Sequence, residues 1–277
     1  MRSAVVPARL AEIIGARELL WNLTLRELRS KYKRSVLGWA WSMLNPIAVM
    51  TIYSVVFRVV MRVEPELGDP SGLHNYALFL LCGLLPFNFL SNALTQGMGA
   101  LVGNASLVKK VYFPREVMVV SATASWVVSF LIELAILAVA LLIAGAFVLP
   151  MLPLVLLVVA VQATFALGLG LVLGILTVYF RDLEHLTGLG LQIWFYASPV
   201  IYPLGYVTER VDQDSLVYRI YEANPMVGFV EVYRDLLYHL RLPDGGTVLY
   251  LLLVSVVTLM AGLLVFNRYA DRVAEEL

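Results

Sequence analysis

Residues 117–180 read VMVVSATASWVVSFLIELAILAVALLIAGAFVLPMLPLVLLVVAVQATFALGLGLVLGILTVYF, and Glu133 is their only Asp, Glu, Lys or Arg. A helix that crosses a membrane needs roughly 20 mostly apolar residues. The segment is therefore too long for one span, and Pro150 and Pro153 divide it into two because proline interrupts helical hydrogen bonding. We predict membrane spans at about 117–146 and 153–178.

The same pattern extends over most of the chain. The apolar fraction is 60% and the charged fraction 14%, whereas soluble domains have about 45–50% apolar and about 25% charged residues. The sequence therefore predicts an all-α integral membrane protein with six transmembrane helices. The four further spans are expected at about 37–60, 76–98, 186–204 and 247–267, and Arg58 near the end of the first is the only Asp, Glu, Lys or Arg in them.

The two ends of the chain differ from the predicted membrane domain, residues 37–267. In residues 8–34, apolar side chains recur at helical spacing on one face, with Arg and Lys elsewhere. A basic amphipathic helix with Trp and Leu on its apolar side is typical of the membrane interface. We therefore expect a cytoplasmic interface helix within residues 1–36, in contact with membrane lipids or a partner, and a short cytoplasmic tail at 268–277.

Arg and Lys are distributed unevenly among the predicted loops. They gather before the first span, in the second-to-third loop, beside Arg181 and in the tail, and such an excess marks the cytoplasmic side. Both termini are thus expected in the cytoplasm of a multi-pass protein. Residues 205–246 would then be external, and they are rich in Asp and Glu.

The end of the fifth predicted span is irregular. Residues 198–203 read SPVIYP, with two prolines four positions apart. Freed backbone groups inside a membrane must face protein or water. We therefore expect a broken or re-entrant element here.

No enzymatic motif is present in the sequence. A Gly-Lys dipeptide, and with it the G-x-x-x-x-G-K-[ST] phosphate loop, is absent. The three histidines are scattered, and Cys82 is the only cysteine, so no metal site is expected. The formal net charge of zero says nothing about partners. No nucleic acid is expected among the partners of this membrane protein, and no cofactor is expected in the chain.

Two features inside or beside the spans have open interpretations. Glu133 either makes a polar contact in a substrate path or between subunits, or packs against a polar neighbour such as Gln162. The loop at 104–116 mixes cations with apolar residues, which suits docking of a short helix into a groove, although its charges can equally serve topology alone. Asn104 or Ser106 is a candidate N-cap for that helix.

Five motifs then point to a family. They are RSKYKRSVLGWAWSMLNP at 29–46, LVKKVYFPRE at 107–116, YFRDL at 179–183, SPVIYP at 198–203 and NPM at 224–226. Together, in this order and with six predicted spans, they resemble the permease subunit of ABC exporters for polysaccharides and teichoic acids. The resemblance covers nearly the whole chain.

The resemblance implies a permease homodimer with two separate ATP-binding subunits, which would carry ATP and Mg²⁺. The substrate would be a lipid-linked glycan of teichoic-acid, O-antigen or galactan type, moved across a bacterial cytoplasmic membrane. The second-to-third loop would couple to the ATPase, and the prolines after the fifth span would belong to short re-entrant helices near an external gate.

The residues expected in these roles fall into four sets. The contact with the ATPase would use Leu107, Lys109, Lys110, Phe113, Pro114, Arg115, Glu116, Arg181 and Asp182. Basic residues on the cytoplasmic side are expected to attract the phosphates of the lipid carrier, namely Lys31, Lys33 and Arg34. The candidates for lining the conduit are Trp39, Trp41, Tyr53, Phe57, Glu133 and Tyr196. The external gate would use Ser198, Pro199, Tyr202 and Pro203.

Three other functions remain open from the sequence. The first is an ABC permease of the same architecture for small drugs or lipids. The second is a membrane enzyme of glycolipid synthesis, and the third is a secondary transporter, for which Glu133 is the only candidate ion site in the membrane core.

Overall fold

The computed structural model describes residues 15–31, 44, 47–49, 51–52, 55–56, 67–111, 113–212, 214–270 and 273–276. These residues form helices, turns and loops, and contain no strand. The predicted all-α fold class is confirmed for this part of the chain. Of the predicted first span, 37–60, only scattered residues are described, and they are helical.

Within the described residues, four helices are long and apolar enough to cross a membrane. They are α4 (Tyr76–Val102), α6 (Glu116–Ile143), α7 (Leu152–Tyr179) with the 3₁₀ turn η2 (Leu149–Met151) before it, and α12 (Gly245–Tyr269). The shorter helices are α2 (Arg17–Lys31), α5 (Ala105–Lys110), α8 (Leu183–Tyr196), α9 (Gly205–Thr208), α10 (Leu216–Glu222), α11 (Pro225–Arg234), the π-helical turn η3 (Asp235–His239) and α13 (Val273–Glu276).

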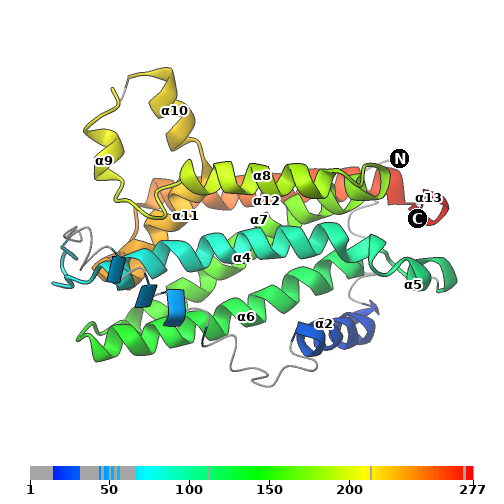
Figure 1. Ribbon diagram of the computed structural model, residues 1–277, viewed down its shortest axis with the longest axis horizontal. Helices are drawn as coiled ribbons and strands as arrows, with labels where there is room; N and C mark the ends of the chain where they lie inside the picture. The colour runs from blue at the N-terminus through cyan, green and yellow to red at the C-terminus, as the bar shows by residue number, and fades with distance from the viewer. Residues whose placement is uncertain are drawn as a thin grey trace.

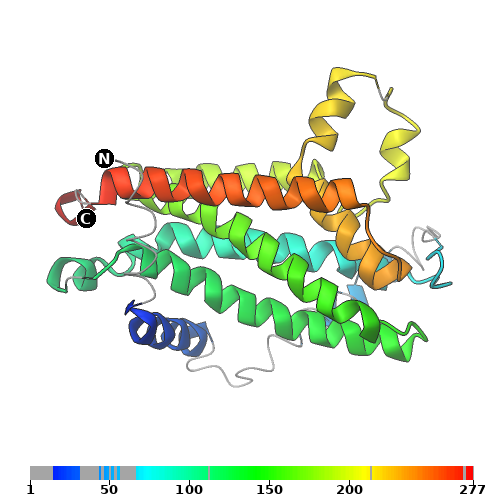
Figure 2. The same ribbon diagram turned by 180° about the vertical axis from the view of Figure 1, so that it is seen from behind.

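Helices α4, α6, α7, α8 and α12 run side by side and alternate in direction along the chain (Figures 1 and 2). One end of the bundle holds α2, α5 and α13, and the other holds α9, α10 and η3. We call these the α5 end and the α10 end. Because the chain alternates, the α4–α6, α7–α8 and α12–α13 connections all lie at the α5 end, and the basic loops predicted to share one membrane side do share one end.

Helix α4 is the centre of the bundle. In its most apolar stretch 83% of the residues are buried, against 22% in α12. Its start is capped by the side-chain oxygen of Asn75, which accepts a hydrogen bond from the Ala77 N–H at 3.0 Å. The many exposed apolar side chains of α12 leave an outer face suited to lipid.

Glycines bring α7 close to its neighbours. A Cβ atom on Gly168 would lie 2.6 Å from the carbonyl oxygen of Thr258 in α12, and one on Gly174 would lie 3.0 Å from that of Gly97 in α4. Small residues at helix contacts allow close backbone packing, which drives helix association in membranes where the hydrophobic effect is weak.

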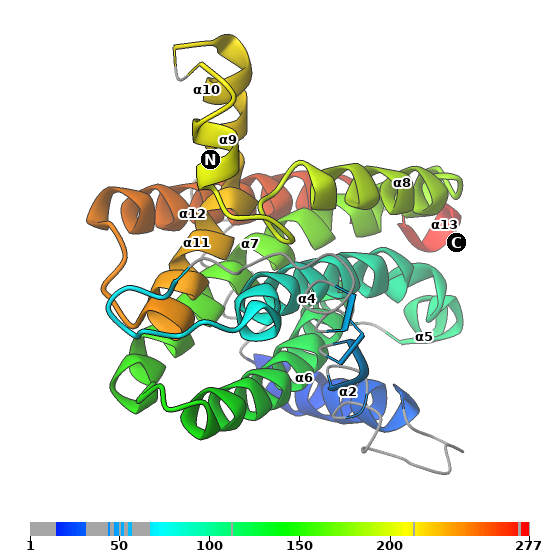
Figure 3. The same cartoon turned by 60° about the vertical axis from the view of Figure 1, so that its left-hand side comes forward.

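The predicted fifth span, 186–204, is helical only to Tyr196, and α8 has 14 residues, fewer than the roughly 20 that a straight span requires. Turns follow through Pro199 and Pro203. The predicted external loop at 205–246 contains α9, α10, α11 and η3. Helices α9 and α10 project from the bundle (Figure 3), whereas most of α11 and η3 is buried against it.

Candidate functional site

The predicted ATPase-contact segment lies at the α5 end. In α5, Val108 is buried, while Lys109 and Lys110 are exposed in the last turn. Leu107 and Phe113 pack against the apolar cluster beneath them. The short helix is therefore fixed by its apolar side and directs its cations outward.

The other residues predicted to contact the ATPase differ in how exposed they are. Pro114 and Arg115 are half-buried, and Glu116 is buried at the first position of α6. Arg181 and Asp182 are exposed in the turn between α7 and α8, at the same end of the bundle. The structure thus brings the two loops to one end, with Glu116 beneath the surface that they form.

Asn104 precedes α5 but does not cap it with its side chain. Its amide nitrogen donates a hydrogen bond to the Ala100 carbonyl at 2.8 Å, and its amide oxygen accepts one from the Arg26 guanidinium at 2.7 Å. The Asn104 side chain therefore ties α2 to the end of α4, and only the backbone carbonyl of Asn104 accepts hydrogen bonds from α5, from the N–H groups of Leu107 and Val108.

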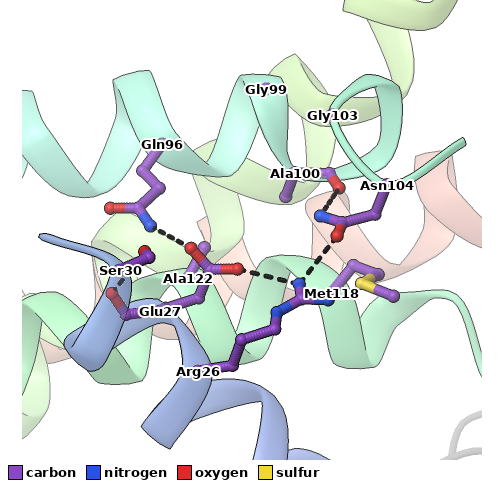
Figure 4. Close-up of a pocket in the computed structure, with 10 residues that line it drawn as sticks. All are labelled: Arg26, Glu27, Ser30, Gln96, Gly99, Ala100, Gly103, Asn104, Met118 and Ala122. Carbon is purple, nitrogen blue, oxygen red and sulfur yellow. Dashed lines mark hydrogen bonds and ion pairs between the residues drawn. The ribbon is translucent and has the colours of Figure 1, made fainter. Parts of the chain in front are cut away.

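Figure 4 shows a cavity of about 430 Å³ between α2, α4 and α6. Along it, Arg26 contacts Glu27 at 2.9 Å, and the other oxygen of Glu27 accepts a hydrogen bond from the Gln96 amide at 2.8 Å. Small residues widen the space on the α4 side, where Gly99, Ala100 and Gly103 line it. The cavity is thus edged by one cation and one carboxylate that already pair with each other.

Lys31, the last residue of α2, reaches into the bundle beside this cavity. Its ammonium group donates to the Ser129 hydroxyl at 3.1 Å and lies 3.4 Å from the centre of the Trp126 ring. The indole N–H of Trp126 in turn donates to the side-chain oxygen of Gln96. Burial lowers the pKa of Lys31 from 10.5 to about 8, against the opposing effect of Glu133 and then Glu27.

Glu133 is half-buried in α6, one turn beyond Ser129. The charge that acts on it is that of Lys31, a partner that the sequence did not suggest. The suggested neighbour, Gln162, is engaged elsewhere: its amide donates to the Pro86 carbonyl at 2.9 Å and accepts from the Tyr233 hydroxyl at 3.0 Å. We call Arg26, Glu27, Lys31, Gln96, Trp126, Ser129 and Glu133 the α2 network.

At the α10 end, Arg234 of α11 holds the turn that was predicted to form the external gate. Its side chain is only 1% exposed. The guanidinium donates to the carbonyls of Val200 at 2.9 Å and Tyr202 at 3.3 Å, contacts Glu231 at 3.0 Å, and lies 3.8 Å from the Phe79 ring. Both terminal nitrogens of the guanidinium therefore have partners, and the cation fixes the turn against α4.

Asn224 makes the second attachment of this turn. Its side-chain oxygen accepts from the Trp194 indole at 2.7 Å and from the Met226 N–H at 3.0 Å. Its amide nitrogen donates to the Ala197 carbonyl and the Ser198 hydroxyl, both at 3.0 Å. One side chain thus uses both its accepting and donating capacity to join α8, the turn and α11.

The remaining predicted residues are placed as follows. Ser198 and Pro199 are buried in the turn, Tyr202 and Pro203 are half-buried, and Tyr196 is exposed on α8. The Tyr202 hydroxyl donates to the Tyr196 carbonyl at 3.0 Å. Outside the described residues lie Lys33, Arg34, Trp39, Trp41, Tyr53 and Phe57. Among the residues that the structure describes, no group of three or more His, Cys, Asp or Glu is placed to hold a metal ion.

A sequence profile of the ABC-2 type transporter family matches residues 18–238. The chain belongs to the ABC-2 type transporter family. Among similar proteins, the O-antigen export system permease protein RfbA of Myxococcus xanthus is 33% identical, over 96% of this chain and 98% of its own length. The O-antigen export system permease protein RfbA of Klebsiella pneumoniae is 30% identical over 93% of this chain and 94% of its own length. The polysialic acid transport protein KpsM of Escherichia coli is 23% identical over 88% of this chain and 91% of its own length.

As a member of the ABC-2 family, the chain is a transport subunit and not itself an enzyme, with its apolar helices as the membrane-crossing part. The sequence had indicated the α5 segment and the SPVIYP turn, but not the residues that hold them. Gln96, Trp126 and Arg234 were missed. The spacing of Met226, Phe229, Val230 and Tyr233 on one face of α11 was the available signal for Arg234, because it predicts a buried helix where a loop was expected.

Proposed function

We propose that this chain is the membrane-spanning permease subunit of an ATP-driven exporter that moves a lipid-linked polysaccharide across the bacterial cytoplasmic membrane. The observation that carries the proposal is the likeness to O-antigen export permeases over nearly the full length of both chains. The all-helical bundle and its four long apolar helices are in keeping with it.

In this proposal α5 transmits movement from a separate ATP-binding subunit. A coupling element must be stiff, so that displacement of the partner is not absorbed locally. The buried Val108 fixes α5 to the bundle, and the exposed Lys109 and Lys110 offer charge to a cleft in the partner. Arg181 and Asp182 would brace the same contact from the neighbouring turn.

The finer architecture is also part of the proposal. Residues 37–60 would supply the first of six spans and α8 with the turn after it the fifth, with α9, α10 and α11 as the external helices. A second copy would complete the conduit. The exposed face of α8 favours such a homodimer, because Leu186, Leu189 and Ile193 are each about 60% exposed on it and Gly188 and Gly190 leave open space beside them.

Helix α2 would lie at the cytoplasmic membrane surface, with both termini in the cytoplasm. Lys31, together with Lys33 and Arg34 of the segment that follows, would attract the phosphates of the lipid carrier. Glu133 and the aromatic residues expected along the conduit would then face the passing glycan, and the turn held by Arg234 would border the external gate.

The test is co-expression with the ATP-binding subunit of the same operon, followed by purification and measurement of ATP hydrolysis. We expect the wild-type chain to co-purify and to change the ATPase rate. Lys109→Glu with Lys110→Glu should lower co-purification at least fivefold, because the reversed charges meet the partner. Arg210→Glu, an exposed reversal at the α10 end, is the matched control and should leave the complex intact.

Two results would count against the proposal. An undiminished complex with the double α5 variant would remove α5 as the coupling element. Failure of the wild-type chain to bind the ATP-binding subunit at all would remove the exporter function.

A further inference from the structure

A second cavity lies at the α10 end, away from the α2 network and next to the gate turn, whose following residue Leu204 lines it. It is a groove of about 640 Å³ between α10, α11 and the first turns of α12. This volume falls within the range of about 300–1,000 Å³ that small-molecule sites occupy. Helix α10, which borders the groove, projects beyond the helix bundle (Figures 1 and 3). The groove therefore lies at the end of the bundle where an exported substrate would emerge.

Three tyrosines give the groove flat apolar surfaces with polar tips. Tyr218 and Tyr221 come from α10 and Tyr250 from α12, and all three are half-buried. The Tyr250 hydroxyl donates to the Ala223 carbonyl at 2.5 Å, which fixes its ring as a wall between the two helices. Tyrosine rings suit the C–H faces of pyranose sugars, while their hydroxyl groups hydrogen-bond to sugar hydroxyls.

The Tyr221 hydroxyl stays neutral over the physiological range. Burial, and then the neighbouring Tyr202 hydroxyl, raise the pKa of Tyr221 far above its ordinary value. The hydroxyl oxygen itself is buried beside Tyr202, so Tyr221 offers its ring and not its hydroxyl to the groove.

Most of the charges around the groove are paired with one another. Its lining contains two arginines, Arg219 and Arg241, against four carboxylates, Glu222, Glu231, Asp235 and Asp244. The sum is 2 − 4 = −2 over the same residues. Arg241 is already paired with Asp235 at 2.7 Å, and Glu231 contacts Arg234 at 3.0 Å.

Asp244 also offsets the positive charge at the start of α12. Its carboxylate accepts a hydrogen bond from the Thr247 N–H at 2.8 Å and caps the helix. A chain that carries a carboxylate or phosphate on each repeat would therefore find no excess of positive charge in the groove, which disfavours its binding relative to an uncharged chain.

We propose that this groove binds a short segment of uncharged glycan as it leaves the membrane domain, and that the polymer handled by this chain is a neutral polysaccharide. The inference rests on the proposed function and narrows its substrate class. It assigns Tyr218, Tyr221 and Tyr250 as sugar-stacking residues, with Arg219 and Glu222 as exposed hydrogen-bonding groups at the rim.

The experiment uses the full-length chain in lipid nanodiscs and saturation-transfer difference NMR with defined oligosaccharides. Mannohexaose and maltohexaose are the neutral probes, and a hexamer of sialic acid is the polyanionic probe. We expect saturation transfer to at least one neutral probe and at least fivefold weaker transfer to the sialic acid hexamer.

Variants then test whether the signal comes from the groove. Tyr218→Ala should lower affinity for the neutral probe at least fivefold, and Glu222→Lys should raise affinity for the sialic acid hexamer. Tyr206→Ala is the matched control, since it removes an exposed tyrosine of α9 at the same end but outside the groove. Should Tyr218→Ala fail to fold, Tyr218→Leu, which keeps apolar volume and loses the aromatic ring, replaces it with the same expected loss.

The outcomes separate this inference from the proposed function. Absence of binding to both neutral probes, equal binding of the sialic acid hexamer, or an unchanged signal in the Tyr218 variant would each overturn the groove assignment. Co-purification of the same preparation with its ATP-binding subunit is measured in parallel. If that complex forms while the groove test fails, the exporter function stands and only the substrate site is wrong.

Discussion

The two ends of the bundle surround a buried cation with different sets of partners. At the α10 end, Arg234 is 1% exposed and is surrounded by two backbone carbonyls, a carboxylate and an aromatic face. At the α5 end, Lys31 makes longer contacts, at 3.1 and 3.4 Å, and its pKa falls to about 8. It also lies beside the cavity of about 430 Å³ that Glu27 borders.

The difference follows from the chemistry of the two cations. A guanidinium is planar and offers five donors in a fixed fork, so it satisfies several acceptors at once. An ammonium group is a compact point charge on a flexible stem, and it loses its proton more readily when buried. The α10 end is therefore built to stay fixed, whereas the α5 end keeps a cation whose charge and position respond to its surroundings.

The largest expected effect is from Arg234→Ala. Removing the guanidinium leaves the Val200 and Tyr202 carbonyls without their donor, and charge-assisted hydrogen bonds of this kind are costly to lose. We expect the free energy of unfolding, measured by titration with sodium dodecyl sulfate, to fall by about 3 kcal/mol.

Arg241→Ala is the control for this change. Arg241 is 51% exposed and pairs with Asp235 at the surface, so its loss should change stability by less than about 1 kcal/mol. Equal effects of the two variants would show that the Arg234 cluster does not hold the turn.

The next effect in size is from Asn224→Asp. The variant keeps the two accepted hydrogen bonds but loses both donated ones, and it places a carboxylate against the Ala197 carbonyl and the Ser198 hydroxyl. The same titration should show a loss of about 2 kcal/mol. Asn22→Asp, on the exposed side of α2, should leave the midpoint nearly unchanged, and a similar loss there would remove the specific role of Asn224.

The Lys31 contacts predict a pH dependence of stability. In the folded chain the pKa of Lys31 is lowered to about 8 from 10.5, so between these values the unfolded chain binds more protons. The free energy of unfolding should therefore rise with pH from about 8 to 10.5. After allowance for partial exposure of Lys31, the rise is roughly 1–2 kcal/mol.

Two variants isolate this pH effect in titrations at several pH values. Lys31→Met should lack the rise, while Lys109→Met, which removes an exposed lysine of α5, should retain it. A slope that is identical in the wild type and in Lys31→Met would mean that Lys31 is not desolvated.

The smallest effect is expected from Trp126→Phe. The variant keeps an aromatic face under Lys31 but loses the hydrogen bond from the indole N–H to Gln96. The free energy of unfolding in the same titration should fall by about 1 kcal/mol. Trp21→Phe, at a residue that is 65% exposed, should stay within about 0.5 kcal/mol. If the Trp126 variant also stays within that range, the link between α4 and α6 through Gln96 contributes little.

The predictability of the site differs between its parts. The α5 segment and the SPVIYP turn were found from sequence because prolines, charges and apolar runs are local signals. The partner of Glu133 was not found, because Lys31 lies about a hundred positions earlier and only the packing of α2 against α6 brings them together. Asn224 was noted as part of a motif, but its four hydrogen bonds join three segments and leave no local trace.

The sequence alone determined that this protein is an all-helical membrane protein and where most of its long apolar helices lie. These properties follow from the free energy of transferring each side chain from water into lipid and from the helix breaks that proline imposes. Only the tertiary structure decided that α11 enters the bundle, that Arg234 holds the turn after α8, and that Lys31 reaches Ser129. Each of these depends on burying a polar side chain at a place where distant segments supply its hydrogen-bond partners. The free energy of those contacts is gained only once the helices are packed.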